Sequence, residues 1–284
     1  MTTTTIGRAV GPLLKEWRVR RGLSQMDLAL DANVSPRHLS FVETGRSRPS
    51  PGLLLALADR LEVPLRERNT FLLAAGYAPR YQQTPLHDPA MTHVRDALQR
   101  LLDSHDPYPG VVVDRIWDAV LVNDAARCLA APLPAELAGP PMNVFRACLH
   151  PDGLARGTRN FPEWAAYLLG QLHRLTVLTA DPELSRLAEE VSRYPNVAAL
   201  ADGRHATATD EPMLLVPWRL DVGGADMSFF TTLTTFGTPR DITLAELAVE
   251  LFYPSDEKTE TALRHARRST RGSLAEVDKK DHLA

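Results

Sequence analysis

The chain has 284 residues, 44% hydrophobic and 24% charged, a composition typical of a globular protein long enough for two domains. It contains no run of about 18 uncharged apolar residues, and its opening is neither basic nor apolar. We therefore expect no membrane span, no secretion and a cytoplasmic location. Only two cysteines occur, Cys128 and Cys148, which excludes a CxxC redox or zinc motif. We expect both thiols to be buried and reduced, with a redox-sensing pair as the alternative.

Charge is distributed unevenly along the chain. Residues 1–80 carry 12 Lys and Arg against 7 Asp and Glu, a net charge of +5, whereas the remainder carries 20 against 28, a net charge of -8. The overall net charge of -3 conceals this difference. A basic N-terminal region attracts phosphates while an acidic remainder is repelled by them, which favours a two-domain protein with a nucleic-acid partner.

Two short helices are predicted before residue 32. The second begins near Gln25, because Ser24 and Asp27 form a capping-box pattern, and it runs to about Leu30. The first is ended by Gly22 and is indicated by four apolar residues at the helical spacing i, i+3, i+4 and i+7: Val10, Leu13, Leu14 and Trp17.

Three further helices follow, two of them after clear start signals. Ser35 and Pro36 supply an N-cap and a first-position proline, so the third helix runs from 36 to about 44, with Gly45 as a left-handed C-cap. Ser50 and Pro51 start a fourth helix in the same way. A fifth follows residue 64 and ends near 76. A short helix, a tight turn and a second short helix place that second helix in the major groove of DNA.

The predicted third helix has an inward and an outward side. Leu39 and Val42 point into a small core, so the opposite side faces the groove. The predicted base contacts on and beside that side are Arg37, His38, Ser40, Phe41 and Thr44. Helix N-termini and exposed basic loops favour phosphates, and the predicted phosphate contacts are Gln25, Ser35, Arg46, Ser47 and Arg48. The alternative is a helical partner-binding module with solvated arginines, which requires every one of these signals to coincide by chance.

Residues 13–64 resemble the helix-turn-helix of the XRE family, the repressor-like phage and bacterial regulators. The family pattern R-x-x-x-G-x-[ST]-Q is present as Arg18, Gly22, Ser24 and Gln25, and E-x-G-x-x-x-P as Glu43, Gly45 and Pro49. The resemblance implies an all-α, five-helix, repressor-like domain over residues 1–76. It also implies that Arg18 and Glu43 form a structural salt bridge and do not contact DNA.

The rest of the chain predicts a second domain. Residues 77–89 are rich in proline and polar residues without periodicity, which is typical of a linker. A helix over 94–102, two strands in 110–123 and helices from 124 to 200 follow. Strand patterns return at 213–222, 225–237 and 244–254, with a Gly-Gly hairpin signal at 223–224. We expect an antiparallel sheet with a helical insertion, an α+β fold overall, and a disordered tail over 269–284.

This order resembles the PAS-like ligand-binding domain of the MmyB-like regulators, which lies behind an XRE helix-turn-helix. The matching segments are AGYAP at 75–79, VVVDRIWDAVLVNDAA at 111–126, NVFRACLHPDG at 143–153 and DPELSRL at 181–187. The resemblance implies a sensor domain over 90–268 that encloses a small apolar, fatty-acid-like molecule. Aromatic and aliphatic groups suit such a ligand, and the candidate pocket walls are Phe145, Phe161, Trp164, Tyr167 and Leu168.

Motifs for other chemistry are absent from the sequence. The nine histidines form no HxxxH or HExxH pattern, and no GxSxG, P-loop or GxGxxG occurs. We therefore expect no enzyme, no cofactor and no metal site. The sequence favours a transcription regulator that binds a roughly palindromic double-stranded DNA operator as a homodimer and responds to its ligand through linked equilibria. The alternative is a C-terminal protein-interaction or dimerisation module without a ligand pocket.

Overall fold

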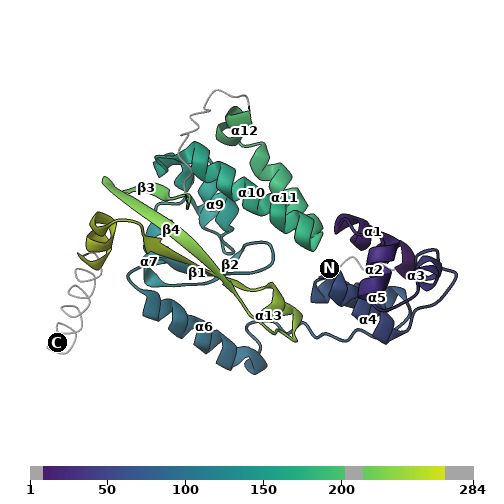
Figure 1. The fold of residues 1–284 in the computed structure, drawn as a ribbon. Coiled ribbons are helices and arrows are strands. Elements are labelled where there is room, and N and C mark those ends of the chain that lie inside the picture. Colours follow the sequence, from purple (N-terminus) through teal and green to yellow (C-terminus); the bar gives the residue numbers. More distant parts are fainter. Residues whose placement is uncertain (1–8, 202–213, 266–284) are drawn as a thin grey trace. The chain divides into compact units, whose positions relative to one another are not determined.

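The computed structural model describes residues 9–201 and 214–265 (Figure 1). The chain divides into two compact units, and we call Met1–Pro85 with Phe236–Ala245 the helical unit, and Leu86–Thr235 with Glu246–Ala284 the sheet unit. The chain thus crosses between the units three times. The sequence did not predict that residues 236–245 would belong with the first 85. The tail expected to be disordered, 269–284, lies outside the described residues.

The helical unit contains the five predicted helices, and its start signals are confirmed. Ser24 and Asp27 form both hydrogen bonds of a capping box, and Ser35 and Ser50 each accept a backbone N–H as N-caps. The left-handed Gly45 has φ 73°. The helices are α1 (Val10–Arg20), α2 (Gln25–Asp31), α3 (Pro36–Glu43), α4 (Pro51–Arg60) and α5 (Leu65–Ala74).

Helices α1 and α3 pack with their backbones in close approach. A Cβ atom at Gly11 would lie 2.5 Å from the carbonyl oxygen of Glu43 and 2.6 Å from that of Val42. Only glycine fits there, so the end of α3 rests directly on α1. Fully buried side chains from all five helices complete the core, among them Leu14, Leu28, Leu39, Leu57 and Phe71.

The sheet unit is an antiparallel sheet with a helical insertion, which confirms the expected α+β fold. Its strand order is β2-β1-β5-β4-β3. The elements before the insertion are η1 (Pro89–Met91), α6 (Thr92–His105), β1 (Gly110–Val113) and β2 (Ala119–Val122). The insertion holds α7 (Asp124–Ala130), α8 (Ala135–Ala138), α9 (Val144–Leu149), η2 (Leu154–Gly157), α10 (Phe161–Thr179), α11 (Pro182–Ser192) and α12 (Pro195–Ala201). After it come β3 (Trp218–Val222), β4 (Ala225–Thr235), α13 (Ile242–Glu246) and β5 (Ala248–Pro254), and residues 257–265 are helical.

Two strand predictions were too long. The segment 213–222 was expected to be one strand, but β3 begins at Trp218. The segment 244–254 was also expected to be one strand, but residues up to Glu246 are helical and β5 begins at Ala248. Asp241 explains the second difference, because its carboxylate accepts the N–H of Thr243 and starts α13.

Helices α9, α10 and α11 cover one face of the sheet, and α6 lies against β1 and β2 on the other face (Figure 1). Large aromatic side chains fill the layer under α10, where the rings of Trp164 and Trp218 stack at 5.6 Å and Trp218 contacts Phe229 and Phe252. Burial of these rings supplies much of the stability of the layer.

The expectation that both cysteines are buried was wrong for one of them. Cys148 on α9 packs in the core beneath the helices, but Cys128 on α7 is exposed. Helix α7 buries its neighbour Leu129 instead, so Cys128 takes the outer side of this short helix.

Candidate nucleic-acid interface and ligand-binding region

Helix α3 has the inward and outward sides that its sequence indicates. Leu39 and Val42 are each 1% exposed and face the core. On the outward side Arg37 and Thr44 are exposed, whereas the predicted base contacts His38, Ser40 and Phe41 are half-buried. Thr44 turns its hydroxyl back to the carbonyl of Ser40 at 2.7 Å.

Phe41 lies between two arginines on this outward side. The guanidinium carbon of Arg37 is 5.3 Å from the centre of the Phe41 ring, and that of Arg46 is 5.9 Å from it. Within the described ranges, neither guanidinium makes a hydrogen bond or an ion pair. Two cations held loosely against one aromatic ring are free to exchange that contact for phosphates or base edges.

The predicted phosphate contacts differ in whether their side chains already have partners in the helical unit. Ser35 is the N-cap of α3, and Ser47 donates its N–H to Phe41, so their side chains stay near the start and end of α3. Arg48 is engaged inside the unit, because its guanidinium donates to the carbonyl of Ala75 at 3.0 and 2.7 Å and lies 4.7 Å from the ring centre of Tyr77. Arg48 therefore joins the loop after α3 to the end of α5.

Arg18 and Glu43 form a buried, bidentate ion pair between α1 and α3. Arg18 donates through Nε at 2.7 Å and through Nη2 at 3.0 Å, and Glu43 also accepts from Nε2 of Gln25 at 2.8 Å. Burial alone would raise the pKa of Glu43, but the hydrogen bonds from Arg18 and Gln25 and the charge of Arg18 outweigh it, so the pKa is lowered. Gln25, a predicted phosphate contact, thus has one side-chain group committed to this network.

The five candidate pocket walls come together in the core of the sheet unit. Phe145, Trp164 and Leu168 are fully buried, and Phe161 and Tyr167 are half-buried beside them. The ring of Trp164 stacks on that of Tyr167 at 5.1 Å and on that of Trp218 at 5.6 Å.

Two buried polar atoms on α10 have no hydrogen-bond partner among the described residues. They are Nε1 of Trp164 and Oε1 of Gln171, which lie two helical turns apart on one face. A buried polar group without a partner loses the hydrogen bonds that it makes in water, so a bound molecule that restored one would gain free energy.

Sequence reasoning missed Glu250, a carboxyl group inside the sheet unit. Glu250 is 2% exposed and lies on β5 between Val111 and Leu233 of the neighbouring strands. Because residues alternate between the two faces along a strand, Glu250 lies on the same face of the sheet as Phe252, which is the face that α9, α10 and α11 cover. Burial raises its pKa to about 7, although a hydrogen bond with the Thr231 hydroxyl acts the other way. The alternation of residues between the two faces of the predicted strand over 244–254 could have indicated that Glu250 is buried.

Cys148 is a second buried titratable group in this core. Burial and the nearby charge of Glu250 both raise the pKa of its thiol. A thiol with a raised pKa is a poor nucleophile, so Cys148 behaves as a small apolar side chain.

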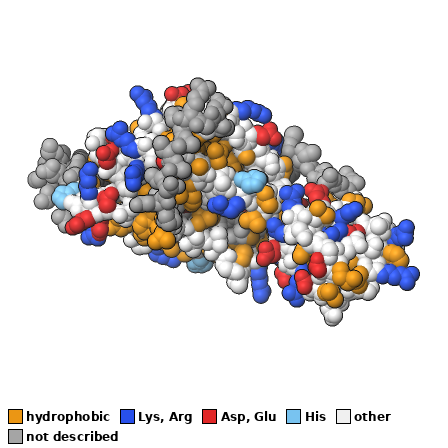
Figure 2. Space-filling view, turned by 45° about the horizontal axis from the view of Figure 1, so that its top comes forward, with side chains coloured by type: hydrophobic (Ala, Val, Ile, Leu, Met, Phe, Trp, Pro, Cys, Tyr) orange, Lys and Arg blue, Asp and Glu red, His pale blue; other side chains and the backbone are white. Residues whose placement is uncertain are grey.

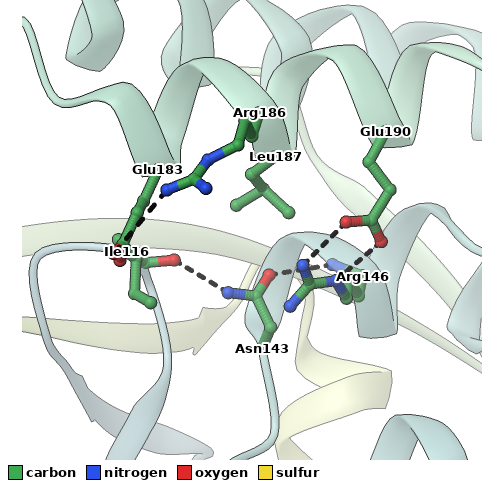
Figure 3. Close-up of a pocket in the computed structure, with 7 residues that line it drawn as sticks. All are labelled: Ile116, Asn143, Arg146, Glu183, Arg186, Leu187 and Glu190. Atoms are coloured by element: carbon green, nitrogen blue, oxygen red, sulfur yellow. Dashed lines mark hydrogen bonds and ion pairs between the residues drawn. The ribbon is translucent and has the colours of Figure 1, made fainter. Parts of the chain in front are cut away.

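A hollow of about 370 Å³ lies at the surface of the sheet unit and has a charged lining (Figure 3). Arg146 forms two hydrogen bonds of 2.7 Å with Glu190, and Arg186 pairs with Glu183 at 3.8 Å. These charges neutralise one another. The lining residues are Ile116, Asn143, Arg146, Glu183, Arg186, Leu187 and Glu190, which include none of the candidate pocket walls.

The part of the chain that the structure describes contains neither a candidate metal site nor a candidate membrane-spanning helix. Its residues include no group of three or more His, Cys, Asp or Glu side chains placed to hold a metal ion. None of its helices has the length and apolar character that a membrane crossing requires.

The helical unit is a helix-turn-helix DNA-binding domain, in which a tight turn joins α2 to α3 and α3 has a polar outward side. It is joined to a sheet domain with an aromatic core. The helix-turn-helix family model matches residues 14–68, and the model for the MmyB-like transcription regulator ligand binding domain matches residues 94–266. The chain therefore belongs to the MmyB-like transcription regulators. These are DNA-binding regulators with a ligand-binding domain and not enzymes, as the sequence indicated.

Similar solved structures include the clp gene regulator ClgR from Corynebacterium glutamicum, with 26% identity over 34% of this chain and 90% of that chain and a TM-score of 0.21. The PAS domain of BvgS from Bordetella pertussis has 16% identity over 64% of this chain and 99% of that chain, with a TM-score of 0.27. At such TM-scores neither likeness adds to what the coordinates and the family models show. No curated protein matches the chain.

Proposed function

We propose that this regulator reads a specific operator with the outward side of α3. Arg37 offers a guanidinium fork to a guanine edge and Phe41 a ring to a thymine methyl, with His38, Ser40 and Thr44 beside them. The predicted phosphate contacts, chiefly Arg46, Ser35 and Ser47, would fix the position of α3 on the DNA backbone. The observation that carries the proposal is the exposure of this side while Leu39 and Val42 hold the other in the core.

We also propose that the regulator acts in the cytoplasm as a homodimer on a roughly palindromic site. One short recognition helix rarely gives enough affinity, and two copies on paired half-sites supply it. Selection of bound sequences from a random DNA pool tests both parts with the full chain. We expect one enriched motif with two-fold symmetry and half-sites about one helical turn apart. A bound pool without an enriched motif would refute sequence-specific reading, and a single unpaired half-site would refute the dimer.

For the sheet unit we propose a small apolar ligand with one polar end, such as a fatty acid. The family match supplies a ligand-binding domain, and its core presents stacked aromatic rings beside the indole N–H of Trp164, which has no hydrogen-bond partner in the part of the chain that the structure describes. That N–H can donate to a carboxylate, and Oε1 of Gln171 can accept from a hydroxyl. The candidate walls, including Phe145, Phe161, Tyr167 and Leu168, would have to separate to admit the ligand, since they now pack against one another.

Titration of dodecanoic and hexadecanoic acid into the full chain, followed by tryptophan fluorescence, tests this ligand class. Trp164→Phe keeps an aromatic ring in the stack but removes the N–H, and we expect it to weaken binding about tenfold. Trp17→Phe makes the same change in the helical unit and should have no effect on affinity. Absence of saturable binding by either acid would contradict the proposal and favour an interaction module.

Linkage would couple the two activities. A ligand that binds the sheet unit differently in DNA-competent and incompetent arrangements shifts the population able to occupy both half-sites. The chain crosses between the units three times, so the two units share more than one covalent connection.

A further inference from the structure

A second hollow, of about 520 Å³, lies at the surface of the helical unit and has a basic lining. Three of its six lining residues are arginines and none is acidic. They come from α5, from the segment after α5 and from the connection between β4 and β5, and are Leu65, Arg68, Arg80, Tyr81, Pro239 and Arg240. We call it the arginine hollow.

One side of the arginine hollow is fixed by Asn69 of α5. Its Oδ1 accepts the backbone N–H of Arg80 at 2.9 Å and of Tyr81 at 3.0 Å, and its Nδ2 donates to the Tyr81 carbonyl at 2.7 Å. Three hydrogen bonds from one side chain hold these two residues against α5. The segment is therefore a defined wall of the hollow, although the sequence had suggested only a linker there.

The part of the wall that contains Arg240 is fixed by its neighbour Asp241. The carboxylate of Asp241 accepts the N–H and the hydroxyl of Thr84 at 3.1 and 2.7 Å, and the N–H of Ile242 donates to the carbonyl of Gln82 at 2.8 Å. The connection between β4 and β5 is thus joined to the segment after α5. A hollow whose walls are already ordered loses little conformational entropy when it binds a ligand.

The arginines give the hollow an excess of positive charge. Arg68 is oriented by a hydrogen bond to the Val63 carbonyl at 2.7 Å and by Asp59 at 3.2 Å, which partly neutralises it. The guanidinium groups of Arg80 and Arg240 have neither a hydrogen bond nor an ion pair with any residue that the structure describes. Two guanidinium groups without a partner among the described residues therefore share one hollow with a third that is already oriented.

We propose that the arginine hollow binds a small organic phosphate of about nucleotide size. Guanidinium groups match phosphate oxygens in pairs, and three of them suit a diphosphate. Leu65, Tyr81 and Pro239 offer an apolar and aromatic surface to the organic part. The volume lies in the range of small-molecule sites and far exceeds what one phosphate group fills, which favours a free ligand over the DNA backbone.

Such a ligand would link α5 to the connection between β4 and β5. It would stabilise the helical unit, because it binds groups that are brought together only in the folded chain. This site is separate from the apolar core of the sheet unit and goes beyond the proposed function.

Calorimetric titration of the full chain with ADP and with inorganic pyrophosphate, in low salt and phosphate-free buffer, tests the proposal. We expect saturable binding of one ADP per chain and a higher Tm in its presence. The double variant Arg80→Ala with Arg240→Ala should weaken ADP binding at least about tenfold, and the matching double lysine variant by less, because lysine keeps the charge but not the fork. Arg95→Ala with Arg100→Ala on α6 removes the same charge elsewhere and should change the affinity less than twofold, roughly.

Three outcomes would overturn the proposal. The first is no saturable binding of either probe by the wild-type chain. The second is equal weakening by the α6 control, which would mean non-specific attraction of anions. The third is an unchanged affinity for ADP in the Arg80 and Arg240 double alanine variant, which would place the binding site elsewhere. Where neither probe binds the wild type, a loss of DNA affinity in the same variant would assign the hollow to the DNA backbone. Unchanged melting of each variant without ligand shows that it folds.

Discussion

The two units hold their functional groups in opposite ways. In the helical unit the predicted base contacts lie on the outward side of α3, where the guanidinium groups of Arg37 and Arg46 lie near the Phe41 ring and form no hydrogen bond or ion pair with any described residue. In the sheet unit the unusual groups are buried, as Glu250 and the indole of Trp164 show. A surface that meets DNA can be built from one short helix, whereas a ligand core needs residues from distant segments. We therefore expect single substitutions in the helical unit to change either its stability or its DNA affinity. Substitutions of the buried groups in the sheet unit should change stability and ligand affinity together.

The largest expected effect comes from breaking the buried ion pair of the helical unit. Arg18→Ala leaves the carboxylate of Glu43, 5% exposed, without its main partner, and should destabilise the unit by about 3 to 5 kcal/mol. Arg20→Ala removes a surface pair with Glu16 and should cost less than about 1 kcal/mol. Thermal or urea unfolding followed by circular dichroism measures both, and equal losses would contradict the structural role of Arg18.

The ion pair also has a defined pH dependence. The pKa of Glu43 is lowered in the folded chain, so the contribution of the carboxylate is present above the ordinary glutamate pKa and is lost as pH falls through the lowered value. The stability difference between the wild type and Arg18→Ala should therefore shrink as pH falls, because protonation of Glu43 removes the contribution that the ion pair makes in the wild type. Urea unfolding of both proteins at several pH values measures this difference, and a difference that stays constant would contradict the role of Glu43.

Glu250 should give the sheet unit the opposite pH dependence. Its pKa is raised to about 7, so its favourable contribution is complete below the ordinary glutamate pKa and is lost as pH rises through about 7. We expect the wild type to lose about 2 kcal/mol of stability, relative to Glu250→Gln, between pH 5 and pH 8. Chemical unfolding at the two pH values measures this difference. Parallel behaviour of the two proteins would show that Glu250 does not titrate in this range.

The helical unit could be predicted from the sequence because its signals are local. Ser24 with Asp27, Ser35 with Pro36, and Gly45 each act within a few residues, and the structure confirms all of them. The pairing of Arg18 with Glu43 came from a family resemblance, and the structure places the two in contact. Arg48 could not be read in the same way, since its carbonyl partner lies on Ala75 and only the folded unit brings them together.

The sheet unit was predictable in outline but not in its site. Alternating and apolar segments predicted the strands, yet the start of β5 depends on a cap at Asp241, a residue that also binds Thr84 far away in the chain. Exposure of Cys128 and burial of Glu250 likewise depend on packing between segments. Figure 2 shows charged side chains of both signs with hydrophobic ones among them across the face drawn.

Arg46 and Arg48 should differ in their effects on DNA affinity and on the stability of the helical unit. The guanidinium of Arg46 forms no hydrogen bond or ion pair within residues 9–201 and 214–265, so Arg46→Ala should leave Tm unchanged. The variant should weaken binding to cognate and random DNA alike and reduce the slope of log K against log salt by about 1. Arg48→Ala removes the link to Ala75 and should lower Tm as well. Fluorescence anisotropy at several salt concentrations, with melting of both variants, separates the two. Loss of Tm in Arg46→Ala would show that our assignment of its role is wrong.

Base reading by α3 is tested most directly by Arg37. The wild type and Arg37→Ala would be titrated against the selected operator, its single-base variants and random DNA. We predict that Arg37→Ala weakens the operator by about 1 to 3 kcal/mol and loses preference at one position of each half-site, with little change on random DNA. Equal weakening on operator and random DNA, with every base preference retained, would contradict base reading by this side of α3.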